Sequence, residues 1–181
     1  MEKTTDKVCW KAKWRIDKFR DPENEITEAM QAGMPINEAM QLFGEAYVGR
    51  EEIENNIALN EGLQELIDII CGLGTATKWD NSNARLGVGD SNAAESSSQT
   101  GLQASTNKTF KAMDTGYPQR TNQTAEWRAT FGSADANYAW EEYTVVNAAN
   151  DTGKNLNRKT ASKGTKASGE SWVLSLQITF S

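Results

Sequence analysis

The sequence predicts a mainly β chain: an antiparallel β-sandwich-like domain with an N-terminal helical segment, an α+β arrangement. Several short runs alternate apolar and polar residues, and clusters of Gly, Asn, Ser and Thr separate these runs, as in antiparallel sandwiches. One further run, at residues 56–71, has apolar residues at helical spacing. The 181 residues are enough to bury a core. We expect residues 1–55 to form a strand plus a helical arm or insertion, and residues 56–181 to form a helix followed by the sandwich.

Residues 8–16 predict the first strand. Their apolar side chains fall on every second position and Lys or Arg on three positions between them, a period of two that indicates a half-buried strand. The apolar positions are Val8, Trp10, Ala12, Trp14 and Ile16. Residues 21–50 are rich in Glu, Met and Ala and are broken by Pro and Gly. This stretch predicts an insertion or arm with short helices, one of them around residues 37–43.

Residues 56–71 predict a helix. Apolar residues recur there at helical spacing, and Gly72 and Gly74 supply a C-terminal stop. We expect this apolar stripe to pack on the core, as such stripes generally do. Its members are Leu59, Leu63, Leu66, Ile67 and Ile70.

The rest of the chain predicts strands at residues 84–88, 125–131, 138–147 and 171–180. The last has the firmest register, because a slip by one residue would place five apolar side chains in water. Those five are Trp172, Leu174, Leu176, Ile178 and Phe180. The long loop from residue 89 to about residue 118 is expected to be functional or ordered by a partner.

Charge and hydropathy exclude two classes of partner. The formal net charge is −6, which argues against a surface that neutralises nucleic-acid phosphates, so no direct nucleic-acid binding is expected. No window approaches the roughly 18 apolar residues of a membrane span. No secretory signal is recognisable either, so we expect a protein that is made in a cytosol and stays soluble.

Catalytic and metal-binding motifs point to a non-enzymatic protein without a cofactor or metal. The chain has no His, which removes the commonest general base and most zinc sites. Glu141 and Glu142 are adjacent in a predicted strand, so their carboxylates should point to opposite faces and not converge on one substrate. The turn at residues 87–92 lacks the Lys and third Gly of a phosphate-binding loop. Residues 80–83 miss the spacing of a calcium loop.

The order of motifs from residue 56 to the C-terminus resembles small structural proteins of tailed bacteriophages. The motifs are Leu59-Asn-Glu-Gly-Leu63, Ala84-Arg-Leu-Gly-Val-Gly-Asp90, Gly116-Tyr-Pro118, residues 125–131, Trp140-Glu-Glu-Tyr-Thr-Val-Val-Asn147, Asn155-Leu-Asn-Arg158 and residues 166–181. The resemblance covers about the last two thirds of the chain and implies a component of the virion, assembled in the host bacterial cytoplasm.

Residues 140–158 are also similar to modules of phage fibres and baseplates, in which a strand carrying Glu is followed by a loop and a segment ending in Arg. This similarity implies that Glu141 or Glu142 pairs with Arg158 as a structural ion pair that bridges neighbouring strands. Such a pair adds little stability if it is exposed and is costly to break if it is buried.

The resemblance does not place the protein within the virion; we expect a capsid-decorating or cement protein that binds the major capsid protein or other virion subunits, as a symmetric homo-oligomer. We expect the N-terminal segment and the loop at residues 89–118 to lie across neighbouring subunits. Six large apolar residues are the candidate contacts, with ordinary core packing as the alternative for each. They are Trp10, Trp14, Phe19, Phe43, Leu102 and Phe110.

Two other functions remain open at this point. One is a tail, baseplate or fibre-adaptor protein, which the similarity of residues 140–158 favours. The other is a carbohydrate-binding module or cell-wall hydrolase, because β-sandwiches with exposed Trp often stack on sugars. A hydrolase would need two carboxylates at a suitable separation in one cleft, which the sequence does not display.

Overall fold

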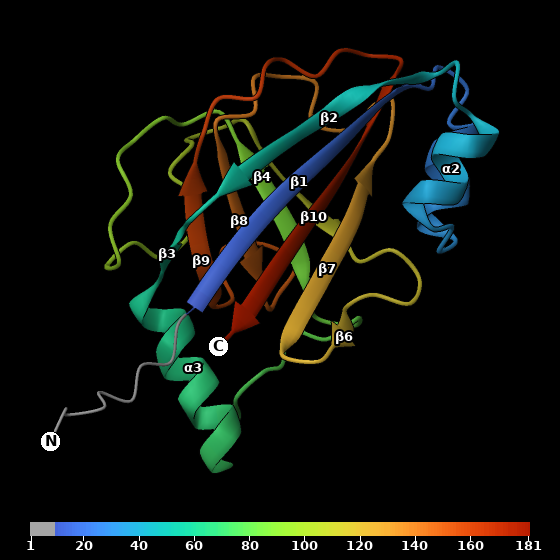
Figure 1. Cartoon of the computed structure of the whole chain (residues 1–181). Helices are drawn as coiled ribbons and strands as arrows, with labels where there is room; N and C mark the ends of the chain where they lie inside the picture. Colours follow the sequence, from blue (N-terminus) through green and yellow to red (C-terminus); the bar gives the residue numbers. More distant parts are fainter. Residues whose placement is uncertain (1–9) are drawn as a thin grey trace, which may run out of the picture.

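The computed structural model describes residues 10–181 and has two five-stranded antiparallel sheets packed face to face (Figure 1). The first sheet has the order β2-β1-β10-β7-β6 and the second the order β3-β9-β8-β4-β5. The strands are β1 (Trp10–Arg20), β2 (Tyr47–Glu54), β3 (Ile57–Ala58), β4 (Arg85–Gly89), β5 (Lys108–Ala112), β6 (Gln119–Thr121), β7 (Thr124–Phe131), β8 (Glu142–Val146), β9 (Asn155–Thr160) and β10 (Glu170–Phe180). The predicted mainly β sandwich is confirmed.

The longest ladder joins the two ends of the described chain. β1 pairs with β10 from Trp10 opposite Phe180 to Arg20 opposite Glu170, and the alternation predicted for both segments sets which side faces inward. The predicted division after residue 55 is therefore wrong, because β1 and β2 supply two of the five strands of the first sheet. A period of two marks a strand but does not say with which distant segment it pairs. Val8, the start of the predicted strand, lies outside the described residues.

The core lies between the two sheets and is centred on aromatic side chains. The fully buried Trp140 packs edge-on against Phe131 and Trp172, with ring centroids 4.8 Å apart in both pairs. Such edge-to-face pairs add to the stability that comes from buried area alone. The inward residues of β1 and β10 complete this core; they include Trp14, Ile16, Leu174 and Leu176.

Two short helices, α1 (Glu25–Gln31) and α2 (Ile36–Leu42), follow β1. They cover one end of the outer face of the first sheet, where Phe19 and Val173 are fully buried together with Ile26, Met30 and Ala39. The short helices predicted between residues 21 and 50 are therefore present, but they pack on their own sheet. Their apolar side chains complete a second small core, and the expected contact of this segment with a neighbouring subunit stays a prediction.

The third helix, α3 (Asn60–Cys71), lies at the end of the sandwich away from α2 (Figure 1). It begins four residues later than predicted, because Ile57 and Ala58 pair with β9 as the edge strand β3. It ends at Gly72, which has a left-handed backbone with φ of 65°, as at many helix C-termini. Within residues 10–181 no helix has the length and apolar character needed to cross a membrane.

Candidate interaction surface

The outer side of α3 carries an apolar surface that the sandwich leaves uncovered. Leu63 is 38% exposed, Ile67 56%, Ile70 75%, and Leu73 just after the helix 55%. We call these four residues the α3 face. Single exposed apolar side chains are ordinary, whereas a group of them on one element marks an interaction site. Spacing of i, i+4 and i+7 is how a helix presents anchors to a partner.

The opposite side of α3 is bound to the second sheet. A Cβ on Gly62 would lie 2.5 Å from both the carbonyl oxygen of Asn155 and the Cα of Leu156, so the glycine permits close contact between helix and strand. Leu59, just before the helix, is fully buried, and Ile69 packs against the core. Only part of the apolar surface of the helix therefore faces the protein interior.

Two carboxylates also hold α3 in place. Glu61 Oε1 accepts a hydrogen bond of 2.8 Å from the backbone N–H of Asn155. Glu65 Oε1 accepts hydrogen bonds from the backbone N–H of Thr77 at 2.6 Å and from Asn147 Nδ2 at 3.1 Å. Hydrogen bonds to charged acceptors are stronger than those between neutral groups. Glu61 and Glu65 therefore lie on the inner side of α3, and the apolar side chains of the α3 face lie on its outer side.

The prediction that the whole stripe packs on the core is wrong for Leu63, Ile67 and Ile70. Periodicity shows that a helix has an apolar side but not whether its own domain covers that side. Gly62 is the signal that could have corrected the prediction, because a helical glycine often marks close packing on its own side. Leu73 was missed altogether, since it lies between the two stop glycines.

The α3 face is uncharged. Asn60, Gln64 and Cys71 are the exposed polar residues of the helix, and none carries a charge in its usual state. α3 has no basic residue in its last turn. Its remaining carboxylate, Asp68, lies about 100° around the helix from Ile67. A partner would therefore meet an apolar strip with neutral polar flanks.

Three of the six predicted contact residues are buried in the chain itself. Trp14 and Phe19 have no exposed surface, and Leu102 is only 4% exposed. The prediction of surface anchors is wrong for these three, because Trp14 belongs to the main core and Phe19 to the small core under α1 and α2. Leu102 is enclosed by the folded loop described below.

The other three predicted contacts are half-buried. Trp10 stacks edge-on against Phe180, with centroids 5.4 Å apart, and its indole N–H donates to Asn56 Oδ1 at 3.0 Å. Phe43 packs against the small core. Phe110 lies over Gly87, where a Cβ would be 2.7 Å from the ring. Each therefore has partners within the chain, and a contact with another subunit stays a prediction.

Arg158 forms its ion pair with Glu142. Its Nε donates to Glu142 Oε2 at 2.9 Å, Nη2 lies 2.7 Å from the same oxygen, and both side chains are fully buried. The resemblance left Glu141 and Glu142 open; Glu141 instead accepts a hydrogen bond from Ser162 Oγ. The strand register selects Glu142. Arg158 lies opposite Thr144, and Glu142, two positions from Thr144, projects from the same face of the sheet.

The loop between β4 and β5 folds back over this ion pair. The carboxylate of Glu142 accepts hydrogen bonds from the backbone N–H groups of Gln103 at 2.8 Å and Ala104 at 2.7 Å. Arg158 Nη1 donates to the carbonyl oxygen of Ala93 at 3.0 Å. The stretch from residue 93 to residue 104 is thus held by its own sheet, and the expected contact of this loop with a neighbouring subunit stays a prediction.

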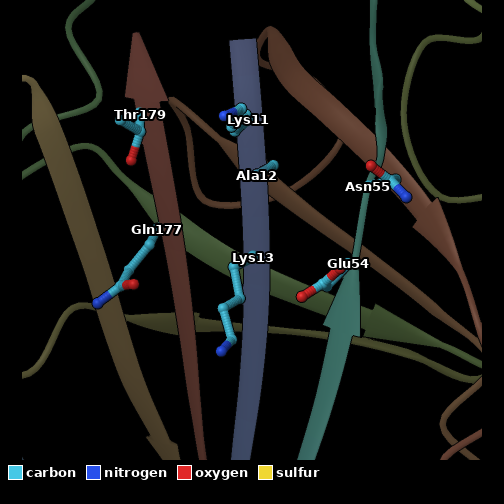
Figure 2. A pocket seen from close by; sticks show the side chains of 7 residues that line it. All are labelled: Lys11, Ala12, Lys13, Glu54, Asn55, Gln177 and Thr179. Atoms are coloured by element: carbon cyan, nitrogen blue, oxygen red, sulfur yellow. The ribbon is translucent and has the colours of Figure 1, made fainter. Parts of the chain in front are cut away.

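A shallow hollow on the outer face of the first sheet is polar. Figure 2 shows its lining side chains along β1 and the adjacent strands β2 and β10. The lining residues are Lys11, Ala12, Lys13, Glu54, Asn55, Gln177 and Thr179. Glu54 is the one carboxylate among them, so the lining offers no pair for acid and base catalysis. Within residues 10–181 no cluster of three or more carboxylates and thiols is arranged to hold a metal ion.

The tryptophans do not form a stacking surface. All six lie within the described residues, and five of them are less than 9% exposed. The five are Trp14, Trp79, Trp127, Trp140 and Trp172. Among the Trp residues, Trp10 is therefore the one left that could stack on a sugar, and its ring already packs against Phe180.

No protein-family model, curated protein or solved structure matches this chain. Of the surfaces described above, the α3 face is the one whose chemistry favours a protein partner, because the exposure of four clustered apolar side chains to water is unfavourable.

Proposed function

We propose that this protein is a non-catalytic structural subunit of a tailed-phage particle, which decorates the capsid and stabilises it by binding neighbouring subunits. The observation that carries the proposal is the α3 face: exposed apolar side chains on a helix that is tied down on its other side. The phage setting comes from the order of sequence motifs between residues 56 and 181.

Binding through this surface requires little reorganisation of the protein. Gly62, Glu61 and Glu65 hold α3 against the second sheet, so the helix does not have to be ordered when a partner arrives. A surface that is already in its bound conformation loses less conformational entropy on association. The sandwich beneath it, with its buried ion pair between Glu142 and Arg158, acts as a stiff support.

Stabilisation of a particle then follows from mass action. A subunit that binds only where its neighbours are assembled shifts the equilibrium toward the assembled state. Burial of the α3 face supplies the hydrophobic part of that binding, at roughly 25 cal/mol for each Å² of apolar surface removed from water. No bond-making step is involved.

The test measures incorporation into particles. Particles are purified from a host strain that carries either the wild-type gene or a variant, and the protein is quantified by mass spectrometry. We expect Ile67→Glu to reduce incorporation at least tenfold, because a charge would have to be buried in the interface. Leu42→Glu is the matched control, since Leu42 is 64% exposed on α2, at the other end of the sandwich (Figure 1).

The same measurement separates two stations in the particle. Hundreds of copies per particle would indicate the capsid shell, whereas roughly six to a few dozen would indicate the tail, baseplate or fibre adaptor, which have lower symmetry numbers. Absence of the wild-type protein from purified particles would refute the proposal as a whole.

A further inference from the structure

We infer that the partner of the α3 face is a second copy of this chain, with the two α3 helices packed antiparallel about a two-fold axis. The inference rests on the proposed function only in treating the α3 face as an interface. It goes further by naming the occupant, the symmetry and the residues that meet.

The apolar pattern of α3 is symmetric about its middle. Leu63, Leu66, Ile67 and Ile70 lie at equal distances on either side of the point between residues 66 and 67. If a second helix lies antiparallel about that point, Leu63 faces Ile70 of the other copy and Leu66 faces Ile67. Each of these four positions then meets an apolar position, which is the self-complementarity that a two-fold interface requires. Leu66 is half-buried, Ile69 packs against the core of its own chain, and Leu73 of the α3 face lies outside this pairing.

Charge repulsion does not oppose self-association through the α3 face. Each chain has a formal net charge of −6, so two copies repel each other over much of their surfaces. A two-fold axis also brings identical groups close together, and like charges near it would be unfavourable. The α3 face avoids this cost, because Glu61 and Glu65 are turned toward their own sheet and hydrogen bonded there.

The size of the face sets the strength of the pairing. One helix of 12 residues offers less than the roughly 800 Å² per partner of a standard stable interface. The dimer should therefore be weak and concentration-dependent in dilute solution. When copies are held side by side on an assembly, the effective concentration is in the millimolar range, and the same contact becomes substantially occupied.

Sedimentation equilibrium of the full chain tests the pairing. Over about 1 μM to about 1 mM protein, a range that spans weak association, the weight-average mass of the wild type should rise from 19.9 kDa toward twice that value. Ile67→Glu should stay at the monomer mass throughout, and Leu42→Glu should follow the wild type. Urea unfolding of each variant checks the fold; Ile67 is more than half exposed in the single chain, so its substitution should leave the unfolding midpoint nearly unchanged.

Cysteine cross-linking tests the orientation. Both native cysteines, Cys9 and Cys71, are replaced by Ser, and Leu63→Cys and Ile70→Cys are made separately. In the antiparallel pair each of these positions lies about 10 Å along the axis from its own copy, too far for a disulfide. Only a mixture of the two variants should cross-link under mild oxidation. Cross-linking of either variant alone would indicate a parallel pair, in which each position meets its own copy, and would overturn the inference.

The outcomes separate this inference from the proposed function. A wild-type chain that stays at 19.9 kDa up to the highest concentration overturns the inference. If Ile67→Glu still lowers incorporation into particles in that case, the proposed function stands with a different partner. If the wild type dimerises and Ile67→Glu does not, but both enter particles equally, the pairing is supported and the role of the α3 face in the particle is refuted.

Discussion

Replacement of Arg158 by Met should strongly destabilise the fold. Met retains an unbranched apolar side chain but removes the guanidinium that lies 2.7 and 2.9 Å from the carboxylate of Glu142. Both side chains are fully buried, so Glu142 would keep a charge with only two backbone N–H donors, those of Gln103 and Ala104. Breaking a buried pair from one side generally costs about 3–5 kcal/mol.

Urea unfolding, followed by Trp fluorescence, measures this effect. For a protein of this size a loss of about 4 kcal/mol moves the unfolding midpoint by roughly 2 M, if the slope is about 2 kcal/mol per M. Lys13→Met is the matched control: it breaks the pair between Lys13 and Glu52, whose side chains are 43% and 46% exposed. An exposed pair contributes little to stability because solvent screens it, so that variant should unfold close to the wild type.

A second measurement separates the ion pair from simple loss of packing. The double variant Glu142→Gln/Arg158→Met removes both charges, so it should recover at least half of the stability that Arg158→Met loses. Arg158 also donates to the carbonyl oxygen of Ala93 and to Gln99 Oε1, and its loss should make the loop containing them the first site of limited proteolysis. If Arg158→Met unfolds within 1 kcal/mol of the wild type, the physical account of this centre is wrong.

Two further predictions concern α3 and a buried lysine. Gly62→Ala should lower the free energy of unfolding in urea by about 2 kcal/mol or more, although Ala is the better helix former, because its Cβ would overlap the backbone of β9. Gln64→Ala, on the exposed side of the helix, is the control and should be neutral or stabilising. A Gly62→Ala variant as stable as the wild type would show that α3 does not pack against β9 at this point. Burial lowers the pKa of Lys166 to about 8, whereas the unfolded chain keeps the ordinary value near 10.5. The unfolded state therefore binds more protons between these pH values, so stability contributed at this site should rise from pH 8 toward pH 10 and be flat below pH 8. Subtracting the urea midpoints of Lys166→Met from those of the wild type at pH 7.5 and 9.5 isolates this slope, and equal differences at the two pH values would contradict it.

The sequence predicted the strands well where large apolar side chains alternate with smaller or polar ones. In residues 171–180 the alternation of Trp172, Leu174 and Leu176 with smaller or polar residues could satisfy only one register, and β10 has it. The helix at residues 60–71 was equally visible, as were the short helices that became α1 and α2. These predictions succeed because the periods of two and 3.6 are local properties of the backbone.

The candidate site was predicted only in part. Residues 63, 67 and 70 were recognised as an apolar stripe, but they were assigned to the core, and the six large side chains chosen as contacts are buried or half-buried. An apolar side chain looks the same in sequence whether its own domain or another molecule covers it. The ion pair of Glu142 with Arg158 was narrowed to two candidates by resemblance, and strand register made the choice.

By itself, the sequence determined the strands with clear alternation and the three helices, because those features depend on side chains a few positions apart; it did not predict the strands β2, β3, β5, β6 and β9. Only the tertiary structure decided that β1 completes a sheet with β10, that the loop after β4 closes over Glu142, and that α3 presents its apolar side to the outside. Each of these outcomes depends on contacts between segments distant in the chain, such as Gly62 with Asn155 and Leu156. Those contacts form only when the two sheets have come together, and they determine which apolar surfaces are left for a partner.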